Sequence, residues 1–159
     1  DYRDVGGQYD HIVSVEMLEA VGEAYWPVYM RALKDRLRRG GRAALQVITI
    51  DEGAFEGYRR GADFIQRYIF PGGMLPSVER LTGEAQAAGL RVRALDRFGD
   101  HYARTLAEWH RRFVAAADEV RMRGFDERFI RMWRYYLAYC EAGFRQGRID
   151  LVQVALEHE

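Results

Sequence analysis

Two short apolar segments, separated by an amphipathic stretch, constrain the fold of this chain more than any other feature. Residues His11 to Val15 (HIVSV) and Ala43 to Ile50 (AALQVITI) are apolar and rich in β-branched side chains, as buried parallel strands are. Between them, Glu23 to Arg38 carries apolar residues at near-helical spacing among charged ones, and we expect Gly40 and Gly41 to end that helix. A strand, a helix and a strand in this order form a βαβ unit. The sequence therefore predicts an α/β fold with a parallel sheet.

The rest of the chain extends this pattern. The other predicted elements are a helix at about 78–88, strands at 90–98 and 150–156, and long amphipathic helices at about 105–121 and 126–146. Ser77 is suited to cap the first of these helices. From about residue 51 to 77 the pattern loosens into two aromatic-rich stretches that end at a Pro-Gly-Gly turn. We therefore expect half of a larger α/β sheet with a helical insertion on top.

Composition narrows the classes of function. The 159 residues suffice for one domain with a real core, and 24 basic residues balance 24 acidic ones, which argues against bulk electrostatic binding of nucleic acid. The single Cys140 excludes an internal disulfide and suits a cytoplasmic location. No apolar run is long enough to span a membrane, no signal peptide opens the chain, and it starts without Met, so we expect a piece of a longer protein.

Five stretches, in register over the whole length, resemble the cyclopropane-fatty-acyl-phospholipid and mycolic acid cyclopropane synthases. They are residues 9–22 (YDHIVSVEMLEAVG), 68–77 (YIFPGGMLPS), 101–109 (HYARTLAEW), 131–144 (RMWRYYLAYCEAGF) and 149–154 (IDLVQV). The resemblance implies a three-layer α/β fold, the second half of a Rossmann-like class I methyltransferase sheet, with its last strand antiparallel. It also implies a lipid-side cap formed by about 51–77 and 105–146. The cofactor is then S-adenosylmethionine, and its glycine loop belongs to the first strand, upstream of this chain. No G-x-G-x-x-G turn follows a strand here, so we expect the chain alone to bind the cofactor poorly and to be inactive.

The resemblance also assigns a catalytic site. Glu19 matches a carboxylate that holds a bicarbonate ion at the reacting carbons, Tyr102 matches a hydroxyl on the same ion, and Ile48 matches a residue whose backbone contacts it. From the residues alone, Glu19 could instead be a carboxylate at a helix entry and Tyr102 a wall residue. Ile48 belongs to the core in either interpretation.

Gln46 departs from the family, which usually has His at this position. Glutamine can still donate a hydrogen bond to an anion, but it cannot carry charge or exchange a proton, which weakens the case for tight bicarbonate binding. A buried amide without a partner costs about 1–3 kcal/mol, so a mere packing role is disfavoured and we expect Gln46 to face the site. With Glu19 and Tyr102 it should converge on one small pocket at the C-terminal ends of the first two strands.

Three further residues match cofactor contacts in the family. Tyr2 and Arg3 fall where related chains lay an aromatic and a polar residue against adenine, and Val15 falls beside the methionine part; loop and core roles remain equal alternatives. An aromatic cluster, made of Phe64, Tyr68, Phe70 and Met74, could line an acyl tunnel, although core is the better interpretation for any one member. The four His residues show no metal-ligand spacing, so no metal site is predicted.

The resemblance implies methyl or methylene transfer from S-adenosylmethionine to the cis double bond of an unsaturated acyl chain, giving a cyclopropane fatty acid. A methylene- or methyl-branched product is an alternative, because the fate of the intermediate cation is decided where Gln46 lies. The expected substrate is a phospholipid or other acyl lipid at the inner face of the membrane, and the expected partners are the upstream half and a second copy in a homodimer. Acyl chain length and double-bond position are left open.

Two further classes of function stay open. The first is a lipid-docking and dimerisation module, in which arginines of the long helices meet anionic headgroups; they are Arg111, Arg112, Arg121, Arg123, Arg128, Arg131 and Arg134. Its alternative is a solvated helix face balanced by acidic neighbours, which are Glu108, Asp118, Glu119, Asp126 and Glu127. The second is a methyltransferase of the same fold that acts on a small soluble molecule.

Overall fold

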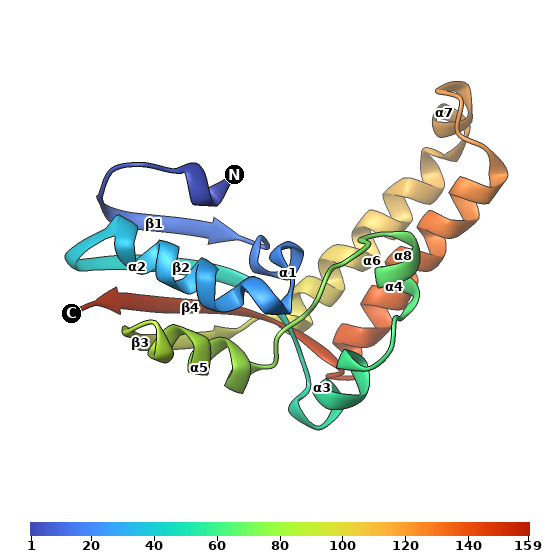
Figure 1. Cartoon of the computed structure of the whole chain (residues 1–159). Helices are drawn as coiled ribbons and strands as arrows, with labels where there is room; N and C mark the ends of the chain where they lie inside the picture. Colours follow the sequence, from blue (N-terminus) through green and yellow to red (C-terminus); the bar gives the residue numbers. More distant parts are fainter. The chain divides into compact units, whose positions relative to one another are not determined.

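The computed structural model describes residues 1–159 and contains one four-stranded sheet with the order β1-β2-β4-β3 (Figure 1). The strands are β1 (Tyr9–Val15), β2 (Leu37–Ile50), β3 (Leu90–Arg97) and β4 (Ile149–His158). β1 and β2 are parallel, whereas β3 and β4 are antiparallel, and Figure 1 shows the arrow of β4 opposed to that of β1. The predicted α/β fold, the single sheet and the antiparallel last strand are confirmed.

The chain folds into two compact units, one that contains the sheet and one that is helical. Residues 1–97 and 150–159 make a sheet unit, and residues 98–149 make a helical unit. The sheet unit contains α1 (Leu18–Val21), α2 (Trp26–Arg36), α3 (Glu52–Arg59), α4 (Phe64–Tyr68), α5 (Val78–Ala87) and the short 3-10 helices η1 (Tyr2–Asp4) and η2 (Glu23–Tyr25). The helical unit contains α6 (Gly99–Ala115), α7 (Ala117–Met122) and α8 (Glu127–Arg145). No helix is sufficiently long and apolar to cross a bilayer.

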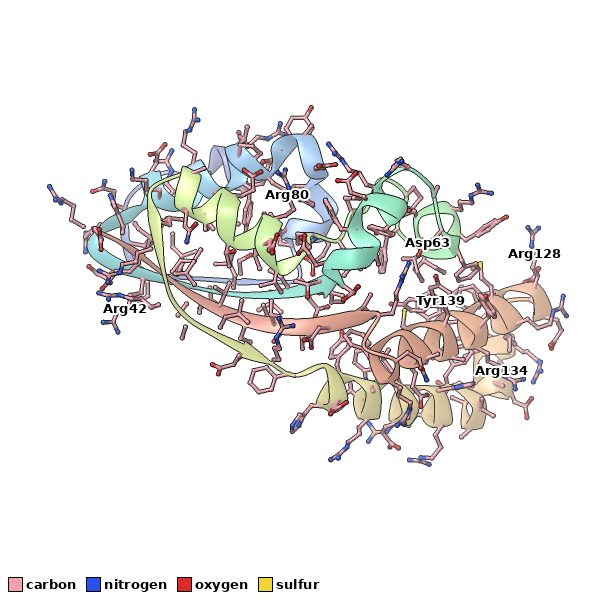
Figure 2. The ribbon with its side chains drawn as sticks, turned by 90° about the horizontal axis from the view of Figure 1, so that it is seen from below. Arg42, Asp63, Arg80, Arg128, Arg134 and Tyr139 are labelled. Atoms are coloured by element: carbon pink, nitrogen blue, oxygen red, sulfur yellow. The ribbon has the colours of Figure 1, made fainter.

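One face of the sheet is covered by helices of its own unit. α2 packs against β2 and against α5, and Figure 2 shows both helices on the same side of the strands. Burial along β2 alternates accordingly, with Leu45 and Val47 buried and Gln46 and Ile48 only half-buried on the opposite face. Apolar β1 residues lie exposed, and Val13 is the most exposed of them at 74%. The sheet unit thus has a helix-covered face and an open one, with the catalytic candidates of β2 on the open face.

The end of α2 differs from the prediction. The helix stops at Arg36, because Leu37 takes an extended backbone conformation and becomes the first residue of β2. Leu37 is fully buried, and the burial of this apolar side chain in the sheet core stabilises the strand at this position. The expectation that Gly40 and Gly41 end the helix was wrong, since both lie inside β2.

Gly40 and Gly41 instead form an irregularity in the pairing of β1 with β2. The register jumps from Tyr9 opposite Leu37 to His11 opposite Arg42, so β2 carries extra residues at this point. Gly40 has a φ of 74°, a left-handed conformation that glycine adopts without strain. Such a bulge bends the longer strand locally.

Replacing Gly41 with alanine should destabilise the protein by about 1–3 kcal/mol, as overpacking in a core does. A Cβ at this position would lie 2.7 Å from the carbonyl oxygen of Arg38 and 3.0 Å from that of Asp10, and neither backbone atom can move away cheaply. The matched control is Gly83→Ala in α5, where no heavy atom lies within 4 Å and alanine should stabilise the helix by up to about 1 kcal/mol. Thermal unfolding of the full-length protein measures both, and an unchanged Gly41→Ala variant would contradict this geometry.

The helical unit is an antiparallel pair of long helices with a short helix at the connection. α6 packs along α8, and Asp126 caps α8 by accepting a hydrogen bond from the backbone N–H of Phe129 at 2.8 Å. The predicted helix at about 105–121 differs in two ways: it begins at Gly99, and it is interrupted at Ala116, which separates α6 from α7. Buried side chains of both long helices, Leu106 and Leu137 among them, hold the pair together.

Candidate active site

Four residues of the sheet unit meet at the end of β1, namely Glu16, Glu19, Gln46 and Ile48. β1 finishes at Val15, and α1 follows after a short turn that begins with Glu16. Glu19 lies on α1, and its backbone carbonyl accepts a hydrogen bond from the N–H of Met74 at 2.8 Å. Ligands of α/β folds bind at the carboxyl ends of the strands, so this edge is the expected position for a site.

Glu19 makes one hydrogen bond with its carboxyl group and leaves one oxygen buried. Its Oε1 accepts the backbone N–H of Ile48 at 2.6 Å, whereas Oε2 is buried without a hydrogen-bond partner. The structure therefore brings together two of the four predicted catalytic residues, Glu19 and the backbone of Ile48. A buried polar atom without a partner costs free energy, so such an atom calls for a functional explanation.

The surroundings raise the pKa of Glu19 from 4.5 to about 7. Burial of the carboxylate is the main cause, the nearby charge of Glu16 adds to the rise, and the N–H of Ile48 opposes it. Both protonation states of Glu19 are consequently populated near neutral pH. A carboxyl group with this property can donate a proton to an anion or accept one from a cation.

Gln46 lies on the same face of β2 as Ile48, but its amide is directed to other residues. Its Nε2 donates to Oε1 of Glu16 at 2.8 Å, and its Oε1 accepts from Nε2 of Gln153 on β4 at 3.0 Å. Because a carboxylate such as Glu16 can only accept, this arrangement fixes the orientation of the Gln46 amide. Gln46 is half-buried rather than turned into the core, yet its donor is used by Glu16 and not by Glu19.

Glu16 is the residue that the sequence analysis missed. It is the only residue other than glycine with a positive φ, at 50°, and its N–H donates to the carbonyl oxygen of Gln46 at 2.8 Å. A left-handed conformation costs a residue with a side chain roughly 1–2 kcal/mol, a cost that glycine avoids. The available signal was a glutamate directly after an apolar strand, three residues before Glu19.

Tyr102 belongs to the helical unit. It lies on α6, half-buried, with its ring in edge contact with the rings of Trp109 and Phe144 at centroid distances of 6.1 and 5.0 Å. Its expected hydroxyl contact with an anion stays a prediction.

The three candidate cofactor residues lie at the start of the chain and at the end of β1, and their contacts with S-adenosylmethionine stay a prediction. Val15 ends β1 with its side chain 59% exposed. The ring of Tyr2 meets Tyr29 edge-on at 5.3 Å, and the guanidinium of Arg3 lies 5.9 Å from the Tyr2 ring while it also binds Asp1. An apolar side chain and an aromatic ring suit the edge of an adenosyl group, but no glycine loop for its methionine part is present in these residues.

The aromatic cluster of the insertion belongs to the core only in part. Tyr68 and Phe70 are exposed by 59% and 56%, whereas Met74 is buried. The preference for core was therefore wrong for Tyr68 and Phe70 and right for Met74. The first two present apolar surface from the segment that follows α3, which is compatible with contact to an acyl chain.

Four of the seven arginines named above form ion pairs with near neighbours in sequence. Arg111 and Arg112 both bind Glu108, Arg121 binds Asp118 and Glu127, and Arg123 binds Glu119. This pairing holds the pKa of Glu108 at about 2, well below its ordinary value. Arg128 and Arg134, labelled in Figure 2, are exposed on α8. The paired residues favour a solvated helix face over an anion-binding surface.

Comparison with known proteins gives a consistent result. Residues 1–154 match the family model described as mycolic acid cyclopropane synthetase. The chain is 48% identical over its whole length to the tuberculostearic acid methyltransferase of Mycobacterium tuberculosis, of which it covers 38%. It is 36% identical to the cyclopropane-fatty-acyl-phospholipid synthase of Escherichia coli K12, with 97% of this chain and 39% of the relative covered.

Solved structures agree with these matches. The crystal structure of mycolic acid cyclopropane synthase CmaA1, complexed with SAH and CTAB, superposes with a TM-score of 0.89 at 27% identity. The superposition covers 98% of this chain and 57% of that one. The chain thus spans about two fifths of the length of the curated relatives that it matches.

Proposed function

Because the chain belongs to the mycolic acid cyclopropane synthetase family, we propose that the whole protein transfers a methyl group from S-adenosylmethionine to the cis double bond of an unsaturated fatty acyl chain and closes a cyclopropane ring. The observation that carries this proposal is Glu19, a buried carboxyl group with one oxygen unpartnered at the carboxyl ends of two parallel strands. The names of the relatives of this chain support the same class of reaction, because they include a cyclopropane synthase and lipid methyltransferases.

The residues of this chain would serve the second part of the reaction. S-adenosylmethionine, when bound, supplies an electrophilic methyl group, which an alkene attacks to leave a cation on the acyl chain. A base must then take a proton from the new methyl group, so that the electrons of that C–H bond close the ring. We assign to Glu19 the role of accepting this proton or of orienting the group that does, and the N–H of Ile48 holds its carboxyl in position.

The cofactor and the rest of the sheet would come from a longer chain. Val15, Tyr2 and Arg3 would contact the adenosyl side, and an upstream half would add the glycine loop. The exposed β1 supports this arrangement, because it is an edge strand in the sheet and its side chains Val13 and Val15 lie open to solvent. An open apolar strand edge favours association with further strands.

The substrate we propose is a phospholipid or similar acyl lipid, reached from the cytoplasmic side of the membrane. Exposed Tyr68 and Phe70 offer apolar surface for an acyl chain. Four of the arginines of the helical unit are paired with acidic neighbours, which reduces the charge available for anionic headgroups, so the lipid-docking alternative has less support than catalysis.

A branched product is the second candidate function. The Gln46 amide is committed to Glu16 and Gln153, in a position where the family usually has a histidine that can carry charge. One relative is named for methyl transfer in tuberculostearic acid rather than for a cyclopropane. Loss of a proton after a hydride shift would leave a methylene group in place of a ring.

The test uses the purified full-length protein with methyl-labelled S-adenosylmethionine and vesicles of unsaturated phospholipid. We expect label in the acyl chains, and the fragments or nuclear magnetic resonance signals of the product distinguish a ring from a branch. Vesicles of saturated phospholipid are the matched control and should take up no label. Label that enters a small soluble acceptor, with none in the unsaturated lipid, would contradict the proposal.

A further inference from the structure

The donors that the family resemblance reserves for a bound bicarbonate are already occupied by carboxylates of the protein. The Gln46 amide donates to Glu16 at 2.8 Å, and the Ile48 backbone N–H donates to Glu19 at 2.6 Å. A further anion would have to compete with both carboxylates for these donors, and it would meet their charge. The arrangement resembles a site in which the anion has been replaced by side chains.

Glu16 holds its place at a conformational cost. Its φ of 50° is one that glycine would adopt freely, while its backbone N–H continues the ladder to β2 through the carbonyl oxygen of Gln46. Strain of this kind persists only where surrounding structure enforces it, and it concentrates at functional sites. Both the backbone and the side chain of Glu16 are bound by one residue, Gln46, which holds the carboxylate next to the end of β1.

A relay of side-chain amides fixes Gln46 in turn. Gln153 on β4 donates to Oε1 of Gln46, so the acceptor end of that amide is satisfied and its donor end must face Glu16. A histidine at position 46 would not need this relay. Gln46, Gln153 and Glu16 therefore act as one unit, and the role of Gln46 is to position Glu16 rather than to bind an exchangeable ion.

We propose that Glu16 is the resident proton acceptor of this enzyme and that turnover does not depend on bicarbonate. The inference rests on the proposed function, because it names the base of that reaction. In the step concerned, a proton leaves the new methyl carbon for a carboxylate oxygen of Glu16, and the C–H electron pair forms the ring bond or the methylene double bond. Glu16 then returns the proton to solvent. Glu19, bound to Ile48, assists from the adjacent turn.

The test compares Glu16→Gly with Glu16→Gln in the full-length protein. Glycine fits the left-handed backbone and leaves room for an anion, so Glu16→Gly should lose about 100-fold or more in turnover and regain part of it with added bicarbonate or formate. Glutamine fills the same space but is not basic, so Glu16→Gln should lose as much turnover and should not regain it with added bicarbonate or formate. Glu79→Gln, an exposed carboxylate on α5, is the control and should retain turnover. The wild type should keep its rate when bicarbonate is removed.

A second readout does not need activity. Carbon-13 bicarbonate, observed by nuclear magnetic resonance, should bind Glu16→Gly and not the wild type. The inference is overturned if the wild type binds bicarbonate or slows when it is depleted, or if Glu16→Gly keeps its turnover without added anion. A wild type that excludes bicarbonate but alkylates no unsaturated lipid would instead refute the proposed function and leave the occupied donors of this site confirmed.

Discussion

Replacing Glu19 with glutamine should lower the turnover of the full-length enzyme by about 100-fold or more, within the range of general acid–base contributions. Glutamine keeps an oxygen that can accept the Ile48 N–H, so the turn between β1 and α1 should persist. What it lacks is a proton that can be exchanged near neutral pH, the property that burial confers on Glu19, whose pKa is raised to about 7. Initial rates with saturating cofactor and lipid measure this effect.

The stability of the same variant provides the control for folding. The pKa of Glu19 is higher in the folded protein, about 7, than its ordinary 4.5, so the folded state binds the proton more tightly. Its contribution is fully present below about pH 4.5 and is lost as the pH rises towards 7, a change of about 3 kcal/mol. Glutamine is neutral throughout, so Glu19→Gln should unfold at a higher temperature than wild type at pH 8 and at a similar one at pH 4.5. Near-normal turnover in this folded variant would remove Glu19 from the mechanism.

A double variant, Glu16→Gly with Gln46→His, should convert the enzyme into one that depends on bicarbonate. Removing the Glu16 carboxylate frees the position that it occupies, and a histidine can provide a charge-assisted hydrogen bond to the incoming anion. Since hydrogen bonds to charged groups contribute about 1.5–3 kcal/mol, we expect added bicarbonate to raise turnover by at least about 10-fold. The product should shift towards the cyclopropane.

The single variant Gln46→His is the matched control for this conversion. With Glu16 still present, histidine has a resident carboxylate to bind, and the response to bicarbonate should be much smaller than in the double variant. Turnover with and without bicarbonate, together with product analysis, measures both. A double variant that stays indifferent to bicarbonate, although folded and able to bind cofactor, would argue against an anion site at Gln46.

Much of the fold follows from local pattern. The β-branched runs of β1 and β2 and the N-cap Ser77 could be predicted, because each signal is contained within a few residues. The end of α2 could not be predicted, because Leu37 could continue the helix or begin a strand. Only the tertiary structure, which buries Leu37 in the sheet, decides between the two. The interruption at Ala116 lies in a run of alanines, where no glycine or proline marks it.

The candidate site, too, could be predicted from the sequence only in part. The resemblance pointed to Glu19 and Ile48, and the structure places the carboxyl of one on the backbone N–H of the other. Glu16 escaped notice because sequence patterns assign left-handed positions to glycine, so a glutamate in that conformation gives no local signal. The partners of Gln46 were equally hidden, because Gln153 lies far along the chain and joins it only through the strand order of the sheet.

The most direct test of the central claim is mass spectrometry of lipids from cells that express the full-length protein and are fed methyl-labelled methionine. Our account predicts that unsaturated acyl chains of phospholipids gain one carbon that carries the label. The same cells expressing Glu19→Gln should show almost none. Lipids that are unchanged by the active protein, with the label appearing in a small soluble metabolite, would contradict the assignment of this chain to an acyl-lipid methyltransferase.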